Sequence, residues 1–406
     1  MSAAQLPPEL RFKIAQHLED SLESTLAIRE TGCNLALVSQ AWREIGTRMC
    51  WRSYDSGCDD ADRASRHPRL LGYVKECKIL CDDQEETEAF VEGVWTHLDH
   101  LEELDMTILD TEVAEPLMAR MCAPTCQLAP LKSLGYFLDT TSYFSANRAH
   151  RTPPPPATLL QILPNVPNLE HLTLRLRTPF RIRESENVAR LPKLERLLVD
   201  IPVPDSETEM DFAGWNQSTC EATLRNLLLV PEAARLRNLF ISHPHITSFS
   251  LETIERFHSL TSFTLRLFPP NIKGILDTIP SLVGRLSQLS ELSVLGTHVA
   301  NNLRPFAKPS RTQLAHFLGS VPESVTILTT HFDLSDPDSK SLVAFFLGRR
   351  VTSRLVEWTY YDIDFEANAI SRRLISNEYV LKRVFRIQES AWETRPAHFI
   401  EVRTDL

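Results

Sequence analysis

The sequence predicts an α/β protein in which a short N-terminal helical module is followed by an irregular solenoid with a mainly parallel sheet. Three observations favour this fold. Residues 1–54 hold two short amphipathic segments, residues 55–72 are polar, and residues 73–406 repeat one leucine-rich pattern. Repeated strand–helix units stack on their neighbours and place a parallel sheet along one face. We therefore expect a helical module (1–54), a linker (55–72) and a solenoid (73–406).

The first amphipathic segment begins at Leu6 and runs to Leu18. It opens with Leu-Pro-Pro-Glu-Leu (residues 6–10), and proline is favoured in the first turn of a helix. Leu10, Ile14 and Leu18 lie at i, i+4 and i+8 and therefore share one helix face.

A second amphipathic segment extends from Leu35 to Ile45 and is followed by Trp51. Leu35, Val38, Trp42 and Ile45 recur at the spacing of one helix face. Two or three short helices with so few apolar residues cannot build a self-sufficient core. Part of their apolar surface is therefore expected to be covered by something else, which is typical of a docking module.

Together these residues resemble an F-box, of the kind found in the divergent F-box families of fungi. The matching patterns are Leu-Pro-x-Glu-Leu at 6–10 and Leu-x-x-Val-Ser-x-x-Trp-Arg-x-Ile at 35–45. The two halves lie further apart than usual, so Asp20–Asn34 is expected to be an inserted loop or an extra turn. The resemblance implies docking to a Skp-type adaptor, and through it to a cullin, by Leu6, Pro7, Leu10, Ile14, Leu35, Val38, Trp42 and Trp51. An ordinary helical cap on a larger domain is the alternative.

From residue 73 onward the pattern L-x-x-L-x-L recurs. Clear copies begin at Leu101, Leu169, Leu194, Leu236, Leu260 and Leu289, and weaker copies at Val74, Leu131, Val325, Leu355 and Leu381. Central positions step from 172 to 197, from 239 to 263 and from 263 to 292, which is 25, 24 and 29 residues. These steps resemble the ~20–29-residue period of leucine-rich repeats. A non-repeating α/β domain in which leucine-rich strands recur by chance is the alternative.

Helical periodicity fills several spacers between these predicted strands. The segments are Glu85–His97, Asn271–Leu286, Ser310–Leu318, Asp338–Leu347 and Glu366–Ser376. Another spacer, Arg148–Pro156, ends in four prolines, which favour an extended segment without ladder hydrogen bonds. We expect a surface insertion there, and a ligand for SH3-type domains is the alternative.

Outward positions on the predicted sheet are where a partner would bind. Side chains alternate along a strand, so the residue between the last two leucines and the one after them point out of the sheet. This rule places Arg175, Arg177, Arg266 and Tyr361 at outward positions. The arginines would suit acidic or phosphorylated side chains of a protein target through forked hydrogen bonds. Alternatively, they are solvated or paired with acids such as Asp200.

Composition and motifs argue against several classes of function. The net charge of -10 is unfavourable for a nucleic-acid partner, because phosphate binding needs a basic surface. No apolar run approaches the ~20 residues of a membrane span, and the N-terminus carries no recognisable secretory signal. We therefore expect a cytoplasmic or nuclear protein without membrane contact. Motifs for phosphate-binding loops, zinc peptidases and serine hydrolases do not occur, and the cysteines lack the C-x-x-C spacing of zinc sites.

These patterns predict a binding protein rather than an enzyme, without a metal or cofactor. The F-box resemblance implies a substrate-recognition adaptor of a cullin-RING (SCF-type) ubiquitin ligase, in which the F-box docks the Skp-type adaptor and the repeats bind an unidentified target protein. The alternative is a non-catalytic scaffold or interaction protein that binds the Skp-type adaptor without forming a ligase.

Overall fold

A computed structural model places the chain in two compact units, Met1–Leu174 and Arg175–Leu406. The structure describes residues 6–22, 25–59, 61–123, 126, 128–139, 157–176, 190–201, 217–242, 252–267, 272–296, 309–333, 338–339, 341–342, 357–364, 369–376, 383–388 and 400–403. The proline-rich segment Arg148–Pro156 and most of Asp338–Leu347 lie outside these residues.

The first unit opens with three helices, α1 (Pro8–Ser21), α2 (Thr25–Val38) and α3 (Gln40–Cys50). Most of the expected inserted loop, Asp20–Asn34, is therefore helix α2, and the single helix expected from Leu35 to Ile45 is divided. Ser39 divides it, because its extended backbone (φ -164°, ψ 163°) ends one helix and begins the next.

The three helices share a small apolar core. It consists of Ala15, Trp42, Ile45 and Met49, with Leu6, Ile28 and Leu35 packed partly buried against it. Two glycines let α2 and α3 approach closely. A Cβ atom on Gly46 would lie 2.4 Å from the backbone N of Ala36, and one on Gly32 would lie 2.8 Å from the backbone O of Gly46.

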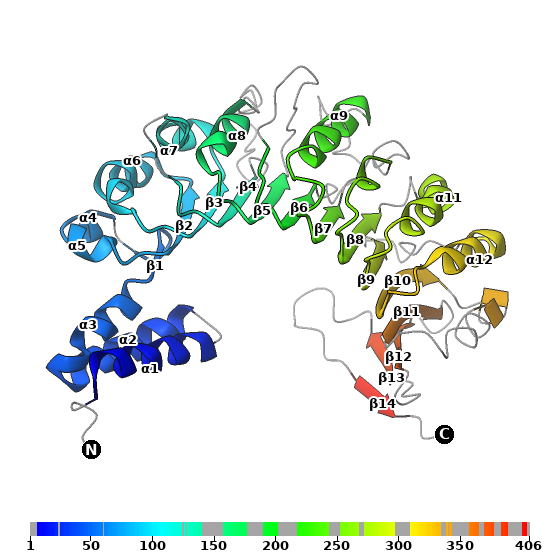
Figure 1. Ribbon diagram of the computed structural model, residues 1–406, viewed down its shortest axis with the longest axis horizontal. Helices are drawn as coiled ribbons and strands as arrows, with labels where there is room; N and C mark the ends of the chain where they lie inside the picture. The colour runs from blue at the N-terminus through cyan, green and yellow to red at the C-terminus, as the bar shows by residue number, and fades with distance from the viewer. Residues whose placement is uncertain are drawn as a thin grey trace. The chain divides into compact units, whose positions relative to one another are not determined.

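Strand–helix repeats follow the three helices in the first unit. The strands are β1 (Ser53–Asp55), β2 (Glu76–Cys81), β3 (Glu103–Ile108), β4 (Ser133–Leu138) and β5 (His171–Leu176). The first four pair in parallel. The helices are α4 (Ala61–Ser65), α5 (Pro68–Leu71), α6 (Gln84–Gly93), α7 (Thr111–Cys122) and α8 (Ala157–Ile162), with the 3-10 turns η2 (Trp95–His97) and η3 (Leu163–Asn165). Helices α6, α7 and α8 lie along one side of these strands (Figure 1).

Local chemistry explains these elements. Leu104, Met106 and Ile108 of β3 are buried, whereas the alternate residues Glu103 and Asp105 are exposed, so the leucine-rich pattern faces the helices as predicted. The helices α6 and α7 each begin with an aspartate, Asp83 or Asp110, whose side chain accepts a hydrogen bond from a backbone N–H of the first turn.

The segment 55–72, expected to be a linker, contains ordered elements. It holds the last residue of β1 and the helices α4 and α5. Strand β1 pairs in register with β2, from Ser53 opposite Glu76 to Asp55 opposite Lys78. The polar composition of this segment thus gives no sign of the two short helices α4 and α5.

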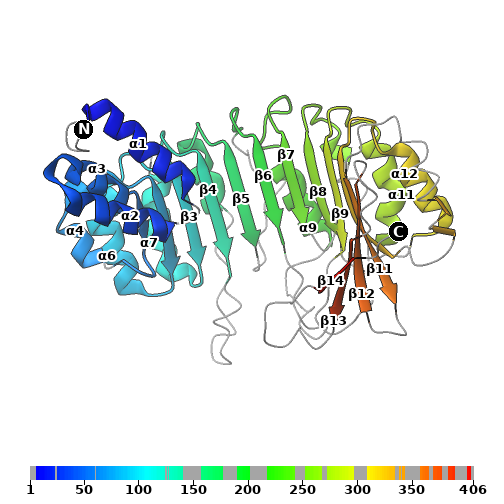
Figure 2. The same cartoon turned by 90° about the horizontal axis from the view of Figure 1, so that it is seen from below.

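The second unit continues the repeats. Strands β6 (Arg196–Asp200), β7 (Asn238–Ser242), β8 (Ser262–Leu267), β9 (Glu291–Gly296) and β10 (Ile327–Asp333) pair in parallel. They lie side by side in Figure 2. The helices between them include α9 (Gln217–Leu228), α11 (Ile272–Val283) and α12 (Arg311–Ser320). The strands β1–β10 confirm the predicted fold class of N-terminal helices followed by strand–helix repeats.

The C-terminal strands depart from the expected repeat. Strand β11 (Glu357–Asp364) pairs in parallel with β10, but β12 (Ala369–Ser376), β13 (Arg383–Gln388) and β14 (Ile400–Arg403) are antiparallel to their neighbours. The helix expected at Glu366–Ser376 is therefore wrong. Its sequence has a short apolar pattern that helix and strand share, and eight paired positions with β11 select the strand. Across the described ranges, no helix combines the length and apolar character needed to cross a membrane.

Candidate functional site

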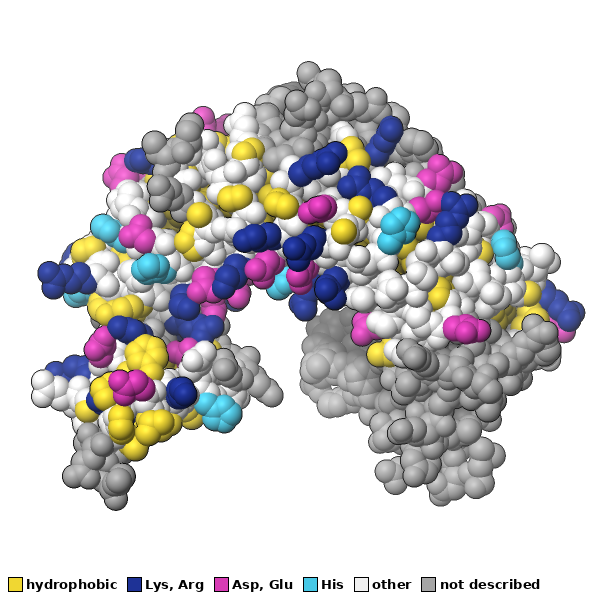
Figure 3. Space-filling model, viewed as in Figure 1, with side chains coloured by type: hydrophobic (Ala, Val, Ile, Leu, Met, Phe, Trp, Pro, Cys, Tyr) yellow, Lys and Arg dark blue, Asp and Glu magenta, His cyan; other side chains and the backbone are white. Residues whose placement is uncertain are grey.

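Exposed apolar side chains gather on the N-terminal helices. Seven large hydrophobic residues are exposed among the described positions, and five of them precede residue 39: Leu10, Phe12, Ile14, Leu37 and Val38. The other two are Leu229 and Ile327. Figure 3 shows hydrophobic side chains on the surface of α1–α3, interrupted by a few charged ones. An exposed apolar concentration on so small a bundle indicates a docking surface.

The exposed residues come from two places on the bundle. Leu10 and Ile14 share one face of α1 and are 47% and 41% exposed. Leu37 and Val38 are the last two residues of α2 and are 84% and 66% exposed. Phe12 is partly covered, because the guanidinium of Arg48 lies 5.0 Å from the centre of its ring. We name Leu10, Ile14, Leu37 and Val38 the apolar docking residues.

The structure divides the eight residues predicted to contact an adaptor. Pro7, Leu10, Ile14 and Val38 are exposed, and Leu6 and Leu35 are partly buried against the helical core. Trp42 is 5% exposed and belongs to that core, so its role is to hold the helices in place. Trp51 is half-buried beside His67, with 6.3 Å between the ring centres.

Two exposed apolar residues, Phe12 and Leu37, were not predicted. Neither fits the helical spacing that was used to choose candidates. Leu37 is adjacent to Val38 at a helix end, where both side chains extend beyond the packed turns. Ser39 follows them directly, and reading it as a helix boundary would have identified the end of α2.

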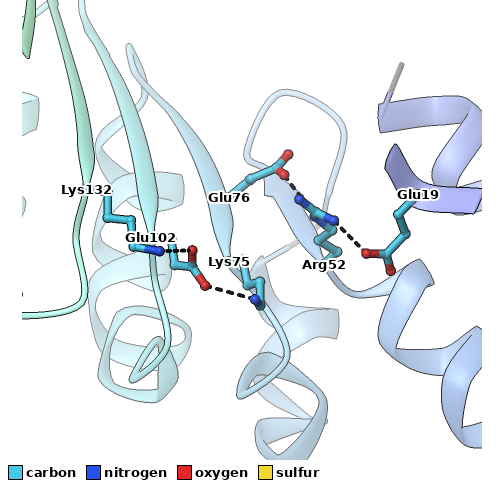
Figure 4. Close-up of polar contacts among 6 residues, drawn as sticks. All are labelled: Glu19, Arg52, Lys75, Glu76, Glu102 and Lys132. Carbon is cyan, nitrogen blue, oxygen red and sulfur yellow. Dashed lines mark hydrogen bonds and ion pairs between the residues drawn. The ribbon is translucent and has the colours of Figure 1, made fainter. Parts of the chain in front are cut away.

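Arg52 joins the helices to the first repeats. Its Nη1 donates to Oε2 of Glu19 on α1 at 2.6 Å, and its Nε donates to Oε1 of Glu76 on β2 at 2.9 Å (Figure 4). Burial opposes the charge on Arg52, but the two carboxylates outweigh it and hold its pKa above the usual value. The backbone O of Arg52 also accepts from the N–H groups of Lys75 and Glu76, at 2.7 and 3.1 Å.

Arg29 on α2 makes a second junction. Its guanidinium forms a two-pronged pair with Asp59, at 2.6 and 3.1 Å, and also donates to the backbone O of Ser53. The hydrogen bond with Asp59 raises the pKa of Arg29 above its usual value. Asp59 further accepts from the backbone N of Asp55 at 2.8 Å, which ties it to β1. Forked pairs of this kind fix orientation as well as distance.

A ladder of charges continues from these junctions along the repeats. Oε1 and Oε2 of Glu102 accept from Lys75 Nζ at 2.8 Å and from Lys132 Nζ at 2.9 Å (Figure 4). These two hydrogen bonds lower the pKa of Glu102 to about 2. The three residues occupy the same position in successive copies of the repeat, directly after Val74, Leu101 and Leu131. The alternation of positive and negative charge at this repeat position can be read from the sequence.

The predicted target-binding residues that the structure describes lie on three different strands. Arg175 on β5 is exposed at an alternate position, as predicted, and Arg177 lies outside the described residues. Arg266 on β8 is half-buried, with its guanidinium 5.4 Å from the ring centre of Phe240 on β7. Tyr361 belongs to β11. Strands β5 and β8 are not neighbours in the strand order, so Arg175 and Arg266 do not form one cluster.

Several features of the described residues bear on metal binding and catalysis. They contain no group of three or more His, Cys, Asp or Glu side chains that could hold a metal ion. A groove between α6 and α7 is lined by Glu88, Val91, Glu92, Pro116, Ala119 and Arg120. It combines two carboxylates with one guanidinium and has no nucleophilic side chain in its lining. Burial raises the pKa of the Cys77 and Cys81 thiols on β2, which makes them poor nucleophiles.

Comparison with solved structures yields distant likenesses, one of them to a leucine-rich repeat-containing protein. No family model matches the chain, and no curated protein sequence matches it. The crystal structure of the leucine-rich repeat-containing protein LegL7 from Legionella pneumophila is similar at 11% identity and a TM-score of 0.35. The likeness covers 68% of this chain and 72% of that chain.

Proposed function

We propose that this chain is a non-catalytic substrate-recognition adaptor of a cullin-RING ubiquitin ligase. Its N-terminal helices would dock a Skp-type adaptor, and its strand–helix repeats would bind the target protein. The observation that carries the proposal is the set of apolar docking residues on a bundle whose own core contains four fully buried hydrophobic residues. The F-box resemblance of residues 6–51 supports the choice of partner.

Energetics favour a partner on this surface. Covering a Leu, Ile or Val side chain with apolar surface contributes about 1.5–3 kcal/mol. Leu37 and Val38 are 84% and 66% exposed, so most of that contribution is still to be gained. Interfaces concentrate their energy in a few such residues near the centre of the contact. Leu10, Ile14 and Val38 are both predicted adaptor contacts and exposed residues, which makes them the central candidates.

The two arginine junctions suit the second half of the proposal. An adaptor acts by holding its target near the ligase, which raises the effective concentration of the target there. A loose connection between docking helices and repeats would dilute that effect. Arg52 and Arg29 instead fasten α1 and α2 to β1, β2 and the loop at Asp59.

Target recognition is proposed for the outward face of the repeats. Arg175 is exposed there and suits an acidic or phosphorylated side chain. Arg266, stacked on Phe240, presents a cation beside an aromatic ring, a combination frequent at protein interfaces. Arg177 and Tyr361 remain predicted contacts of the same kind.

Binding of the purified full-length chain to a purified Skp-type adaptor, with and without cullin, tests this function. We expect the wild type to bind the adaptor and, through it, cullin. The double change Leu37→Asp with Val38→Asp should weaken adaptor binding at least ten-fold, because two charges would be buried at the contact. Leu229→Asp with Ile327→Asp is the matched control, since both residues are exposed and apolar but lie outside the bundle.

Two results would change the conclusion. Adaptor binding that survives the Leu37/Val38 change in a folded protein contradicts docking through the end of α2. Capture of the adaptor without cullin favours the scaffold that binds a Skp-type adaptor and assembles no ligase.

A further inference from the structure

Two cysteines meet where α2 and α3 approach closely. The Sγ atoms of Cys33 on α2 and Cys50, the last residue of α3, lie 3.2 Å apart, within hydrogen-bonding distance. A Cβ atom on the neighbouring Gly32 would lie 2.8 Å from the backbone N of Cys50, so the two backbones also approach closely here. A disulfide requires adjacent sulfurs and Cβ atoms about 3.5–4.5 Å apart, and the contact between the two Sγ atoms meets the first requirement.

The surroundings give the two thiols different properties. Cys33 is exposed, whereas Cys50 is half-buried and donates a hydrogen bond to the backbone O of Arg29 at 3.5 Å. Burial, followed by the hydrogen bond with Cys33, raises the pKa of Cys50 to about 12. An oxidant therefore reaches Cys33 first, while Cys50 remains a protonated thiol beside it.

We propose that Cys33 and Cys50 form a reversible dithiol–disulfide site that reacts with hydrogen peroxide and ties α2 to α3. The proposal stands independently of adaptor binding. It concerns residues that the sequence alone gave no reason to pair, because they lie 17 positions apart without a C-x-x-C spacing.

The chemistry balances in two steps. The Cys33 thiolate attacks one oxygen of peroxide, which breaks the O–O bond; hydroxide leaves, takes up a proton as water, and Cys33 becomes a sulfenic acid. The Cys50 sulfur then attacks the Cys33 sulfur, the S–O bond breaks, and the thiol proton of Cys50 leaves with the departing hydroxide as a second water. Two electrons pass from the two thiols to peroxide. Glutathione or another thiol reductant reverses the reaction by thiol–disulfide exchange.

The two reaction steps assign a role to each cysteine. Cys33 is the attacked position, and Cys50 is the resolving thiol. Once Cys33 is a neutral sulfenic acid, it no longer opposes ionisation of Cys50 by its negative charge, so the resolving step becomes easier. The new covalent bond would lie one helical turn before Leu37 and Val38 and would restrain the end of α2 that carries them.

Mass spectrometry of the full-length protein tests the site. The reduced protein is treated with hydrogen peroxide near equimolar amounts, its free thiols are alkylated, and it is digested without reductant. We expect a cross-linked peptide pair containing Cys33 and Cys50, which dithiothreitol converts back to two free thiols. In Cys50→Ser, dimedone should instead trap Cys33 as a sulfenic acid; in Cys33→Ser, the cross-link should be lost and Cys50 should stay reduced.

A second measurement follows the effect on the helices. The peroxide-treated wild type should be cleaved within residues 6–50 roughly ten-fold or more slowly than the reduced protein, since a cross-link restricts the unfolded chain. Neither single-cysteine variant should show that protection. The proposal is overturned if Cys33 and Cys50 are both alkylated after peroxide treatment, or if the exposed Cys58 is oxidised in their place. It is also overturned if peroxide protects Cys50→Ser from cleavage as much as it protects the wild type.

Discussion

Arg52 Nε lies 2.9 Å from Glu76 Oε1, which connects the second residue after α3 to the first residue of β2. The same guanidinium reaches Glu19 on α1 at 2.6 Å. One side chain therefore bonds to two elements that are separated by more than fifty residues of sequence. Its side chain and both carboxylates are less than a third exposed, so water replaces these bonds poorly.

Replacing Arg52 by alanine should destabilise the first unit by about 1–2 kcal/mol, because two half-buried carboxylates lose their partner. Chemical denaturation followed by circular dichroism measures this change. Arg52→Lys should retain part of the stability, since an ammonium group can pair with one carboxylate but cannot fork between two. Arg311→Ala is the control: its pair with Asp338 spans 3.9 Å with both side chains about 70% exposed, and pairs of that kind contribute ~0–1 kcal/mol. Equal losses at the two positions would contradict a special role for Arg52.

Glu102 should make stability depend on pH. Its pKa falls from 4.5 to about 2 in the folded protein, because Lys75 and Lys132 donate to it. A lowered folded-state pKa adds stability above the unfolded value, and that stability is lost as the pH falls from 4.5 towards 2. After screening by water, the contribution is about 0.5–1 kcal/mol.

The experiment compares unfolding free energies of the wild type and Glu102→Gln between pH 7 and pH 2.5. The difference in unfolding free energy between the two proteins should be largest at neutral pH and should shrink below pH 4.5. Glu88→Gln, a change at an exposed glutamate bonded only to Gln84 at 2.9 Å, provides the reference curve. If the unfolding free energies of the wild type and Glu102→Gln change with pH in the same way, then Lys75 and Lys132 do not lower the pKa of Glu102.

Trp42 should matter for folding of the helices. It is 5% exposed and is the largest member of the four-residue core with Ala15, Ile45 and Met49. Trp42→Ala removes about 3–5 kcal/mol of packing, which exceeds what so small a core supplies. Limited proteolysis should then cut within residues 6–50 while the repeats stay intact. Arg43→Ala, at the adjacent exposed position, should leave the cleavage pattern unchanged; a Trp42→Ala protein as resistant as the wild type would place the tryptophan outside the essential core.

The repeats were predictable because their pattern is local. Each copy carries its own alternation, as in Leu104, Met106 and Ile108, and each strand pairs with the next copy along the chain. The antiparallel C-terminal strands were not predictable in the same way. The residues of β12 have no decisive period, and their state depends on pairing with β11.

Helix α2 was missed for a different reason. Asp20–Asn34 was expected to be an inserted loop or an extra turn because the two halves of the F-box pattern lie further apart than usual. Glycine also disfavours a helix interior by about 1 kcal/mol relative to alanine, and Gly32 lies inside α2. In the fold, Gly32 is required because α3 passes too close for any side chain. Tertiary packing thus overrides local propensity at this position.

The candidate site was predictable only in part. Periodicity identified Leu10, Ile14 and Val38 as apolar, but it does not tell which apolar face lacks a cover, so Trp42 was grouped with them. The contacts of Arg52 with Glu19 and Glu76 span 33 and 24 residues. Each of these three is an ordinary surface residue in the sequence, and only the fold brings them together.

Gly46 provides the sharpest test of how α2 and α3 pack. An added Cβ would lie 2.4 Å from both the backbone N of Ala36 and the backbone O of Gly32. These are backbone atoms of a helix, so they cannot turn aside as a flexible side chain would. Gly46→Ala should therefore force the helices apart and destabilise the bundle by about 1–3 kcal/mol, despite the better helix propensity of alanine.

Gly319→Ala is the matched control, because Gly319 also lies in a helix, α12, but a Cβ there meets nothing within 4 Å. That change should be neutral or stabilising by up to ~1 kcal/mol. Hydrogen exchange resolved by peptide measures both changes locally: amides of residues 25–50 should exchange faster in Gly46→Ala, and those of residues 311–320 should not in Gly319→Ala. The same separation of α2 and α3 should move the Cys33 and Cys50 sulfurs apart and lower the yield of their cross-link. Unchanged exchange in Gly46→Ala would mean that the two helices pack less closely than their glycines indicate.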